Sequence, residues 1–483
     1  MASFVERFDL WTEQQAKQAE AIAQQIQQDD RIELVRFVFP DQHGLLRGKT
    51  LVASAAVSAL REGVNMTTTL LAKDTSHATV FPVFSAGGGF EFDGMQGGAD
   101  FVMVADPATF KILPWQPKTA WLLCDIYFTD GRPIPLGTRR ILRRALDELA
   151  DHGYALTAGL EVEFHVFRVL DKRMALDDAS ANANPGTPPD IELLSHGYQY
   201  LTEQRYDDVD EVMELLRHTM QGLELPLNSL EIEFGPSQFE LTFGTMEGMV
   251  AADTMILLRN AIKQVCRRHG FHATFMCRPR IPNVMSSGWH LHQSLKKLDT
   301  GENAFIPQEE GRQLSPLGEH YLGGLIEHAA GAAIFSTPTI NGYRRYRPNS
   351  LAPDRASWGR DNRGAMLRVL GGLGQNTTRI ENRVGEPAAN PYLYLASQVF
   401  SGLDGINRQL MPGPSADAPY ESPAQALPRS VPDALQALRD DAYLCEQFTN
   451  LFVEYFCHIK QAEVDRFNLE VSAWEHKEYF DLF

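Results

Sequence analysis

Cysteine is scarce in this sequence and forms no recognisable motif. Only five cysteines occur among 483 residues, and no two of them make a CxxC pair. An odd, scattered set argues against a disulfide framework and against a cysteine-rich zinc site. We therefore expect reduced thiols in a cytoplasmic protein. The five are Cys124, Cys266, Cys277, Cys445 and Cys457.

Long apolar runs and an excess of basic charge are also missing. No apolar run approaches the roughly 18 residues of a membrane span. The polar, glutamine-rich stretch from Met1 to Asp30 has no apolar signal-peptide core. The formal net charge is -18, which argues against binding to nucleic acid or to an anionic membrane. A local group of arginines could still bind phosphate.

The remaining composition is that of an ordinary globular chain, with 44% apolar and 22% charged residues. We expect an N-terminal domain over residues 1–115, led by a helix over 11–29, and a second domain over 116–483. The boundary is placed near Pro114-Trp115, where a series of short strands broken by glycine clusters ends.

Five short segments alternate like β-strands, but one face of each is charged. Because side chains along a strand alternate with a period of two, each segment directs its ionisable groups to one side. A solvent-exposed sheet face is the alternative for any single segment. Five together favour a barrel or curved sheet whose concave side is a polar cavity. The segments are GLEVEFHVF (159–167), SLEIEF (229–234), QFELTF (238–243), GWHLHQSL (288–295) and TRIENR (378–383).

The charged faces combine glutamates, histidines and arginines. Glutamate pairs with a histidine and no cysteine suit hard divalent ions such as Mg²⁺ or Mn²⁺. Carboxylates held this close repel one another unless a cation lies between them. Arginines directed into the same space indicate an anion such as carboxylate or phosphate. Metals, arginines and phosphate together are typical of phosphoryl transfer.

The charged segments resemble, in order along most of the chain, the motif set of the glutamine synthetase family. Further segments add to the resemblance: PDQHGLLRGK (40–49), PTINGYRRYRP (338–348), DNRGAMLRV (361–369) and the C-terminal part from LPRS to WEHKEYF. The resemblance implies an α+β fold with an N-terminal β-grasp-like domain. A glutamine synthetase-type catalytic domain would follow, with a curved antiparallel β-sheet or partial barrel flanked by helices.

The resemblance also implies a metal site with two or three Mg²⁺ or Mn²⁺ ions, and ATP as co-substrate. One ion would be held by Glu163, Glu233 and Glu240. The other, which bridges the nucleotide phosphates, would be held by Glu161, His290 and Glu381.

Roles for further residues follow from the same resemblance. Glutamate would bind Arg345 and Arg383, with His292 and Ser286 nearby. Arg363 and Arg368 would stabilise the transferred phosphoryl group, and Ser294 and Arg379 would contact the nucleotide. Asp41 would come from an adjacent subunit and position or deprotonate the amine. Pairing with a core carboxylate is the alternative for Arg368, and a structural role is the alternative for His292.

One segment departs from the family pattern. Glutamine synthetases carry a flap glutamate before Ala-Pro, which helps to bind ammonium. Here residues 347–354 read RPNSLAPD, so Leu351 takes that place. A leucine removes the negative charge and offers apolar contact. We therefore expect an organic amine as nucleophile: arylamines such as aniline first, because they are neutral at pH 7, then alkylamines, with polyamines disfavoured.

The sequence thus predicts an ATP-dependent ligase that joins the γ-carboxylate of glutamate to an amine through γ-glutamyl phosphate. The resemblance implies a homo-oligomer of stacked rings, often a dodecamer, with active sites between subunits. Three alternatives stay open. They are an ordinary glutamine synthetase using ammonia, a family member that has lost catalysis, and a phosphotransferase of the related guanidino-kinase fold.

Overall fold

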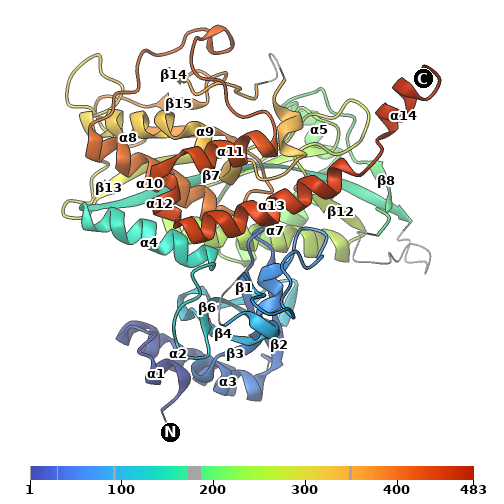
Figure 1. Ribbon diagram of the computed structural model, residues 1–483, viewed down its shortest axis with the longest axis vertical. Helices are drawn as coiled ribbons and strands as arrows, with labels where there is room; N and C mark the ends of the chain where they lie inside the picture. The colour runs from blue at the N-terminus through green and yellow to red at the C-terminus, as the bar shows by residue number, and fades with distance from the viewer. Residues whose placement is uncertain (1, 30, 91–93, 172–185, 348–350) are drawn as a thin grey trace.

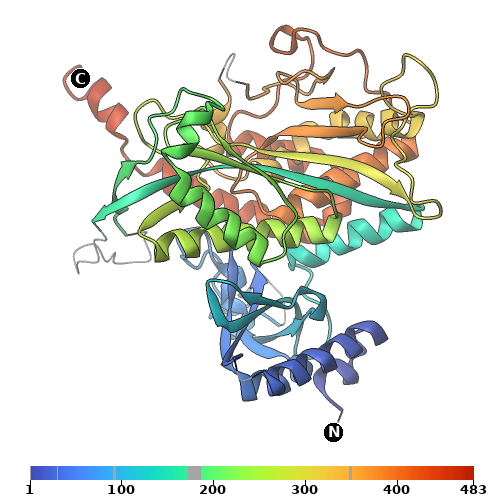
Figure 2. The ribbon, with the colours of Figure 1, turned by 180° about the vertical axis from the view of Figure 1, so that it is seen from behind.

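A computed structural model describes residues 2–29, 31–90, 94–171, 186–347 and 351–483. Figure 1 shows a smaller N-terminal unit lying below a larger second unit. The C-terminal helix α14 (Ala473–Tyr479) projects from the side of the larger unit (Figures 1 and 2).

The N-terminal unit combines a mixed sheet with short helices. Its strands are β1 (Leu34–Pro40), β2 (Leu46–Val52), β3 (Val64–Thr67), β4 (Asp100–Ala105), β5 (Lys111–Leu113) and β6 (Gln116–Phe128). Its helices are α1 (Phe4–Arg7), α2 (Glu13–Gln28), α3 (Ala53–Glu62), η1 (Thr68–Ala72), η2 (Gln96–Gly98) and η3 (Pro107–Thr109). The strand order is β2-β1-β6-β4-β3, with β5 on β6.

The alternation of β1 explains how this sheet forms its core. Val35, Phe37 and Phe39 are each at most 1% exposed, and the residues between them face outward. Each buried aromatic side chain contributes about 2–3 kcal/mol to stability. Strand β1 runs parallel to β6 and antiparallel to β2, with helix α3 following β2. This arrangement agrees with the β-grasp-like domain expected from the sequence.

Strand β6 bears on the domain boundary. It pairs with β1, β4 and β5 and so lies in the middle of the first sheet. The sheet therefore continues to Phe128, beyond the boundary expected near Trp115. We propose a boundary between Phe128 and Thr138, where α4 begins.

The second unit contains a ten-stranded sheet. Its strands are β7 (Tyr154–Asp171), β8 (Asp190–Leu193), β9 (Leu227–Ile232), β10 (Gln238–Phe243), β11 (Met246–Glu247), β12 (Phe271–Thr274), β13 (Trp289–Lys297), β14 (Trp358–Arg360), β15 (Leu367–Leu370) and β16 (Arg379–Gly385). The main strand order is β14-β15-β16-β13-β7-β10-β9, and β8, β11 and β12 also pair with the long strand β7.

Helices flank this curved, mostly antiparallel sheet, as expected from the sequence. They are α4 (Thr138–Asp151), α5 (Glu203–Asp207), α6 (Asp210–Gly222), α7 (Gly248–Arg268), α8 (Pro316–Glu327), α9 (Ala329–Ser336), η5 (Gly342–Arg345), α10 (Pro391–Arg408), η6 (Pro419–Glu421), α11 (Val431–Asp440), α12 (Ala442–Phe448) and α13 (Asn450–Asn468). Figures 1 and 2 both place α4 and α7 between the sheet and the N-terminal unit.

The two faces of β7 differ in character, and this difference positions the candidate site. Val162, Phe164 and Val166 are fully buried, and the ring of Phe164 stacks 5.2 Å from that of Phe275. Helices α4 and α7 pack against β7. Because side chains alternate along the strand, Glu161 and Glu163 point to the opposite face.

A buried arginine joins the two units. Arg139, near the start of α4, is 3% exposed in its side chain. It forms ion pairs with Asp106 (2.6 Å), Asp125 (3.1 Å) and Asp253 (2.9 Å). The first two carboxylates belong to the N-terminal unit and the third to α7, so one guanidinium ties both units to α4. Removing one partner from such a buried cluster costs about 3–5 kcal/mol.

Within the described part of the chain, none of the helices combines the length and apolar composition needed to cross a membrane.

Candidate active site

Glu161 of β7 lies between two histidines of β13. His290 is its direct cross-strand partner, and Nδ1 of His290 lies 2.5 Å from Glu161 Oε1. Nε2 of His292 lies 2.9 Å from Oε2. A carboxylate only accepts hydrogen bonds, so both ring nitrogens donate. Burial alone would raise the pKa of Glu161, but the histidines outweigh burial and hold this pKa below its ordinary value.

Glu163, Glu233 and Glu240 gather next to Glu161. Glu240 of β10 lies directly opposite Glu163 of β7. Burial and the charges of Glu161 and Glu163 raise the pKa of Glu240 to about 11. Burial and the charge of Glu163 raise the pKa of Glu233 to about 8. Repulsion between the carboxylates contributes to both shifts beside burial, and a bound cation would relieve it.

Among the residues that the structure describes, two sets of side chains have the geometry to hold metal ions. Glu161, Glu240 and His290 form one set, and Glu161, His292 and Glu381 form the other. Within each set the ligand atoms lie within 4.8 Å of one another. Carboxylates with one imidazole suit a hard divalent cation. The structure thus brings His292, expected from the sequence at the substrate, into the carboxylate cluster.

Glu381 of β16 is fully buried, and arginines surround it. Nη1 of Arg368 donates to Glu381 Oε2 at 3.0 Å, and Arg383 forms an ion pair with Oε1. Burial would raise the pKa of Glu381, but His290 and Arg383 outweigh burial and lower it. Arg368 also pairs with Asp361. In this structure Arg368 therefore pairs with carboxylates, which is the alternative role considered for it from the sequence.

Arg345 approaches the histidine strand from the turn η5. Its Nη1 donates to the carbonyl oxygen of Gly385 at 2.9 Å, and its Nη2 lies 3.4 Å from His290 Nε2. A Cβ atom on Gly288 would lie 2.4 Å from Arg345 Nη2. A larger residue at 288 would displace the Arg345 guanidinium, so glycine at this position permits the observed contact of Arg345 with the histidine strand.

Of the remaining predicted residues, Ser294 and Arg379 lie on strands, and Arg363 lies in the turn between β14 and β15. Nε of Arg379 donates to His292 Nδ1 at 3.1 Å. Ser294 lies opposite Thr157 in the β13–β7 pair. Arg363 is exposed, and its carbonyl oxygen accepts a hydrogen bond from Arg383 Nε at 3.1 Å.

Two predicted substrate contacts lie on loops. The hydroxyl of Ser286 accepts a hydrogen bond from Arg278 Nη1 at 2.9 Å. Leu351 is 52% exposed and has a φ of 58°, in the left-handed region that non-glycine residues rarely occupy. Residues 348–350 of the expected flap lie outside the described residues.

Asp41 is not among the residues that converge. Its side chain is fully buried in the N-terminal unit. Its Oδ1 accepts hydrogen bonds from the backbone N–H groups of His43 and Leu45, both at 2.9 Å, and its Oδ2 accepts from Arg47 Nε at 2.9 Å. The carboxylate therefore orders the loop that follows it.

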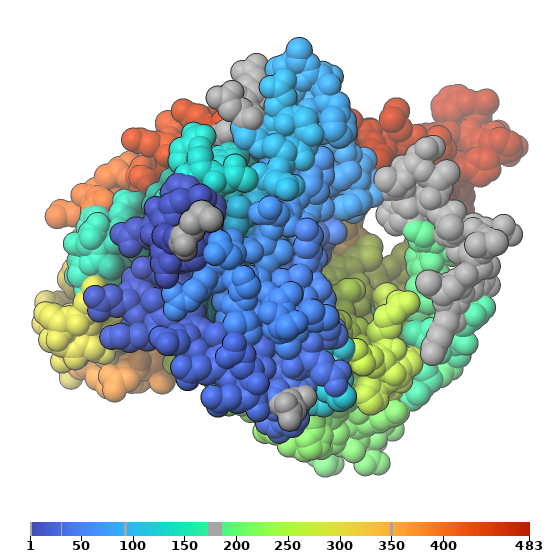
Figure 3. Space-filling model, turned by 90° about the horizontal axis from the view of Figure 1, so that it is seen from below, coloured from blue at the N-terminus to red at the C-terminus, as the bar shows by residue number. Residues whose placement is uncertain are grey.

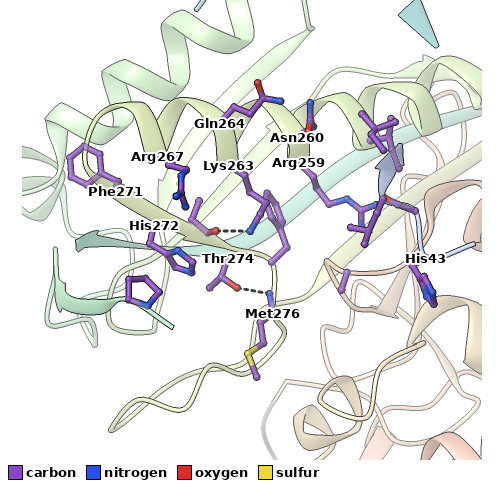
Figure 4. A pocket seen from close by; sticks show the side chains of 18 of the residues that line it. His43, Arg259, Asn260, Lys263, Gln264, Arg267, Phe271, His272, Thr274 and Met276 are labelled. Atoms are coloured by element: carbon purple, nitrogen blue, oxygen red, sulfur yellow. Dashed lines mark hydrogen bonds between the residues drawn. The ribbon is translucent and has the colours of Figure 1, made fainter. Parts of the chain in front are cut away.

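The same loop borders a cavity of about 920 Å³ beside α7 and β12. Basic side chains line it, among them Arg259, Lys263 and Arg267, and Nζ of Lys263 donates to the carbonyl oxygen of Ala273 (Figure 4). Figure 3 shows the N-terminal unit lying across this side of the molecule, with a recess beside the yellow-green segment. Among the described residues that line the cavity there is none of the carboxylate cluster.

Sequence reasoning gave no role to Gln238, although it placed this residue on the polar face of β10. Its Nε2 donates to Glu163 Oε2 at 3.0 Å and to Ser287 Oγ at 3.1 Å. The backbone N–H of Gly288 donates to the same Glu163 oxygen at 3.0 Å. Gln238 therefore fixes the direction of Glu163, and its place two residues before Glu240 was the available signal.

Comparison with known proteins agrees with this geometry. The family model described as glutamine synthetase, catalytic domain, matches residues 136–479. A gamma-glutamylanilide synthase of Acinetobacter sp is 43% identical, with 99% of each chain covered. A glutamate–isopropylamine ligase of Pseudomonas sp is 32% identical, with 93% of this chain and 95% of the relative covered. The solved structure of GmaS without ligand superimposes with a TM-score of 0.78 at 27% identity, covering 95% of this chain and 99% of GmaS.

The fold and the carboxylate–arginine site are those of a ligase that works on a carboxylate. The chain belongs to the glutamine synthetase family and is a ligase of that family. Members of this family use ATP and divalent metal ions. The described residues fit such ions, because the two overlapping sets share Glu161 and because burial, together with the charges of neighbouring glutamates, raises the pKa values of Glu233 and Glu240.

Proposed function

We propose that this enzyme joins the γ-carboxylate of glutamate to an organic amine, with ATP converted to ADP and phosphate. The observation that carries the proposal is the convergence of Glu161, Glu163, Glu240, His290 and Glu381 with arginines on one face of the sheet. The similarity to a gamma-glutamylanilide synthase and to a glutamate–isopropylamine ligase supports an organic amine as the nucleophile.

The reaction takes place in two steps. First, a γ-carboxylate oxygen of glutamate attacks the γ-phosphorus of ATP, and ADP leaves with the electron pair of the broken P–O bond. This step forms γ-glutamyl phosphate. Second, the amine nitrogen forms a C–N bond to the acyl carbon, and phosphate leaves with the electrons of the C–O bond. The nitrogen loses one proton, and the product is a γ-glutamylamide.

Residues of this chain bind and orient the reactants. Arg345 and Arg383 bind the carboxylates of glutamate, with His292 and Ser286 beside them. Arg363 and Arg368 stabilise the negative charge that develops on the transferred phosphoryl group. Ser294 and Arg379 contact the nucleotide. Bound Mg²⁺ or Mn²⁺, two or three per site, supplies further neutralisation of the phosphate charge.

The nature of the amine follows from the flap. Leu351 offers apolar contact where an ammonium ion needs a carboxylate, so a neutral aromatic amine fits best and an alkylamine fits next. A polyamine would leave its distal ammonium without a partner. Ammonia, the substrate of an ordinary glutamine synthetase, is the second candidate, because the rest of the polar site is equally suited to it.

The active enzyme is proposed to be a homo-oligomer of stacked rings, with a dodecamer as the expected size, located in the cytoplasm. The exposed C-terminal arm supports self-association, since Val471, Trp474, Phe480, Leu482 and Phe483 are each at least 60% exposed (Figure 1). Large apolar side chains gathered on one projecting segment indicate a partner surface. In such a ring the loop of Asp41 would lie near a neighbouring active site.

An amine panel tests the proposed function. The purified full-length enzyme receives glutamate, ATP, Mg²⁺ or Mn²⁺ and one of aniline, isopropylamine, ethanolamine, putrescine or ammonium. Phosphate release and the mass of the product are measured. We expect γ-glutamylanilide to form with the highest kcat/KM. Efficient turnover with low ammonium and none with the organic amines would identify an ordinary glutamine synthetase.

A further inference from the structure

The strand register indicates from which end the amine reaches the acyl phosphate. Along β7, Thr157 lies opposite Ser294, and Glu163, six residues further on, lies opposite Glu240. The proposed nucleotide contact Ser294 places ATP at the Thr157 end of the cluster. With ATP at that end, the nucleophile would approach from the opposite end, beyond Glu240.

Two aromatic side chains lie at that opposite end. Phe234 directly follows Glu233, and its backbone N–H donates to Glu233 Oε2 at 2.9 Å. The ring of Tyr200 stacks on that of Phe234, with centroids 5.2 Å apart and an interplanar angle of 14°. Tyr200 is 46% exposed and Phe234 is 39% exposed. We call this pair the aromatic ledge.

The ledge adjoins the carboxylate cluster, because Phe234 directly follows Glu233 in the chain and Tyr200 stacks on Phe234. Burial, followed by the charges of Glu233 and Glu240, raises the pKa of the Tyr200 hydroxyl to about 12, and Arg363 acts in the opposite direction. The pKa of the hydroxyl is thus influenced both by the carboxylates and by the arginine proposed to act on the phosphoryl group.

The ledge is fixed before any substrate arrives. The backbone N–H of Tyr198 donates to the carbonyl oxygen of Phe234 at 2.7 Å. The backbone N–H of Leu201 donates to the carbonyl oxygen of Ile232 at 3.3 Å. Gly197 has a φ of 71°, and a Cβ atom there would lie 2.5 Å from the carbonyl carbon of Gly235. The segment that carries Tyr200 is therefore held against the end of β9, and a preorganised surface loses little entropy on binding.

We propose that the aromatic ledge of Tyr200 and Phe234 binds the aryl ring of the amine and so selects arylamines as nucleophiles. This inference rests on the proposed function, in which an amine attacks γ-glutamyl phosphate. The ring stacks on the ledge and its nitrogen points toward the acyl carbon, where the C–N bond forms. Phosphate leaves with the electrons of the C–O bond, and the nitrogen releases a proton to phosphate or solvent.

Ring contact on the ledge favours aromatic over aliphatic amines. Aromatic pairs are more favourable than the burial of their surface alone would make them. A small aliphatic amine offers no ring, so it gains only ordinary apolar contact there. Tyr200 and Phe234 do not touch the reacting atoms and act as determinants of substrate specificity.

The test compares Tyr200→Ala, Tyr200→Phe and Phe234→Leu with the native enzyme. Phe84→Ala is the control, because Phe84 is 84% exposed on the N-terminal unit. For Tyr200→Ala we expect the KM for aniline to rise about tenfold, and that for isopropylamine to rise less than about threefold. Tyr200→Phe keeps the ring and stays near the native values. KM values for glutamate and ATP stay unchanged in all variants.

Three outcomes decide the inference. Equal increases in KM for aniline and isopropylamine would overturn it, since a general disturbance has that effect. An unchanged KM for aniline in both Tyr200→Ala and Phe234→Leu would overturn the ledge but leave the proposed function intact. Only a native enzyme that forms no γ-glutamylamide from any organic amine would overturn both the ledge and the proposed function. Thermal melting of each variant identifies any that fails to fold, and the remaining ledge variant then decides.

Discussion

Glu163 and Glu240 are direct cross-strand partners on β7 and β10, and both side chains point to the same face of the sheet. Cβ atoms of such partners lie about 5 Å apart, and like charges in this position destabilise a sheet. Gln238 and the backbone of Gly288 nevertheless hold Glu163 in place. The fold thus maintains a repulsive arrangement that a divalent cation would stabilise.

Glu240→Gln separates stability from activity. The amide keeps the shape of the side chain and, like the protonated carboxyl that its raised pKa favours, carries no charge, so the melting temperature in a chelator should stay within about 1 °C of the native value. The increase in melting temperature on adding Mn²⁺ should shrink. Activity should fall by about 100-fold or more, the usual result of losing a group that stabilises transition-state charge. Differential scanning fluorimetry and a phosphate-release assay measure these effects. A lower melting temperature in chelator, with a full response to Mn²⁺, would contradict the metal assignment.

Leu351→Glu tests the role of the flap in choosing the amine. A carboxylate at this exposed position offers ammonium a charged partner, and because solvent screens the pair it contributes only about 1.5 kcal/mol, the low end for charged hydrogen bonds. The ratio of kcat/KM for ammonium to that for aniline should therefore rise about tenfold. Leu351→Gln is the matched control, with the same length and no charge, and should leave this ratio almost unchanged. Equal ratios of kcat/KM in the two variants would show that the flap does not influence the choice of amine.

Asp41→Asn distinguishes a structural from a catalytic role for this buried carboxylate. The substitution removes the ion pair with Arg47 and disturbs the loop. If Asp41 also takes a proton from the incoming amine across a subunit boundary, the loss of kcat should be larger for isopropylamine, which arrives charged, than for aniline, which arrives neutral. We expect at least a fivefold difference between the two losses, or about 1 kcal/mol. Equal losses for both amines would restrict Asp41 to ordering its loop.

His328 predicts how stability depends on pH. Its ring lies between Asp441 (2.7 Å from Nδ1) and Asp404 (2.9 Å from Nε2), and Arg408 also pairs with Asp404. Burial opposes the charged ring, but the two carboxylates outweigh burial and raise the pKa of His328. A histidine with a raised folded pKa stabilises the protein fully below its unfolded pKa. This stabilisation is lost as the pH rises through the folded pKa.

His328→Phe should therefore lower the free energy of unfolding by about 3 kcal/mol at low pH, because two buried carboxylates lose their partner. The difference in melting temperature from the native enzyme should be larger at about pH 5.5 than at about pH 9.5, on either side of the ordinary histidine pKa. His152→Phe, at an exposed histidine, is the control and should show no such trend. A difference that is the same at both pH values would exclude a charged His328.

Much of the fold and site could be predicted from local pattern. The alternation in GLEVEFHVF placed Glu161 and Glu163 on one face of a strand, and the structure has them there. The sequence did not predict that β6 joins the first sheet, because an apolar run indicates a buried strand but not the sheet to which the strand belongs. Pairing with β1, about 80 residues earlier in the chain, decides this.

Other features depend on contacts between distant segments. The segment that carries Tyr200 shows no periodicity, so only its backbone hydrogen bonds to the end of β9 reveal that it reaches the cluster. The buried ion pairs of Arg139 join residues up to 114 positions apart. The hydrogen bonds that Asp41 forms within its own loop were not predicted for a different reason. The motif over residues 40–49 suggested a role at a neighbouring subunit and gave no sign of these local hydrogen bonds.

Direct competition between two nucleophiles tests whether this enzyme prefers an aromatic amine to ammonium. The enzyme receives glutamate, ATP and Mn²⁺ with equal concentrations of aniline and ¹⁵N-labelled ammonium, and mass spectrometry measures the two amide products. We predict that γ-glutamylanilide exceeds labelled glutamine at least tenfold, equal to about 1.4 kcal/mol in transition-state binding. Labelled glutamine as the main product would contradict it.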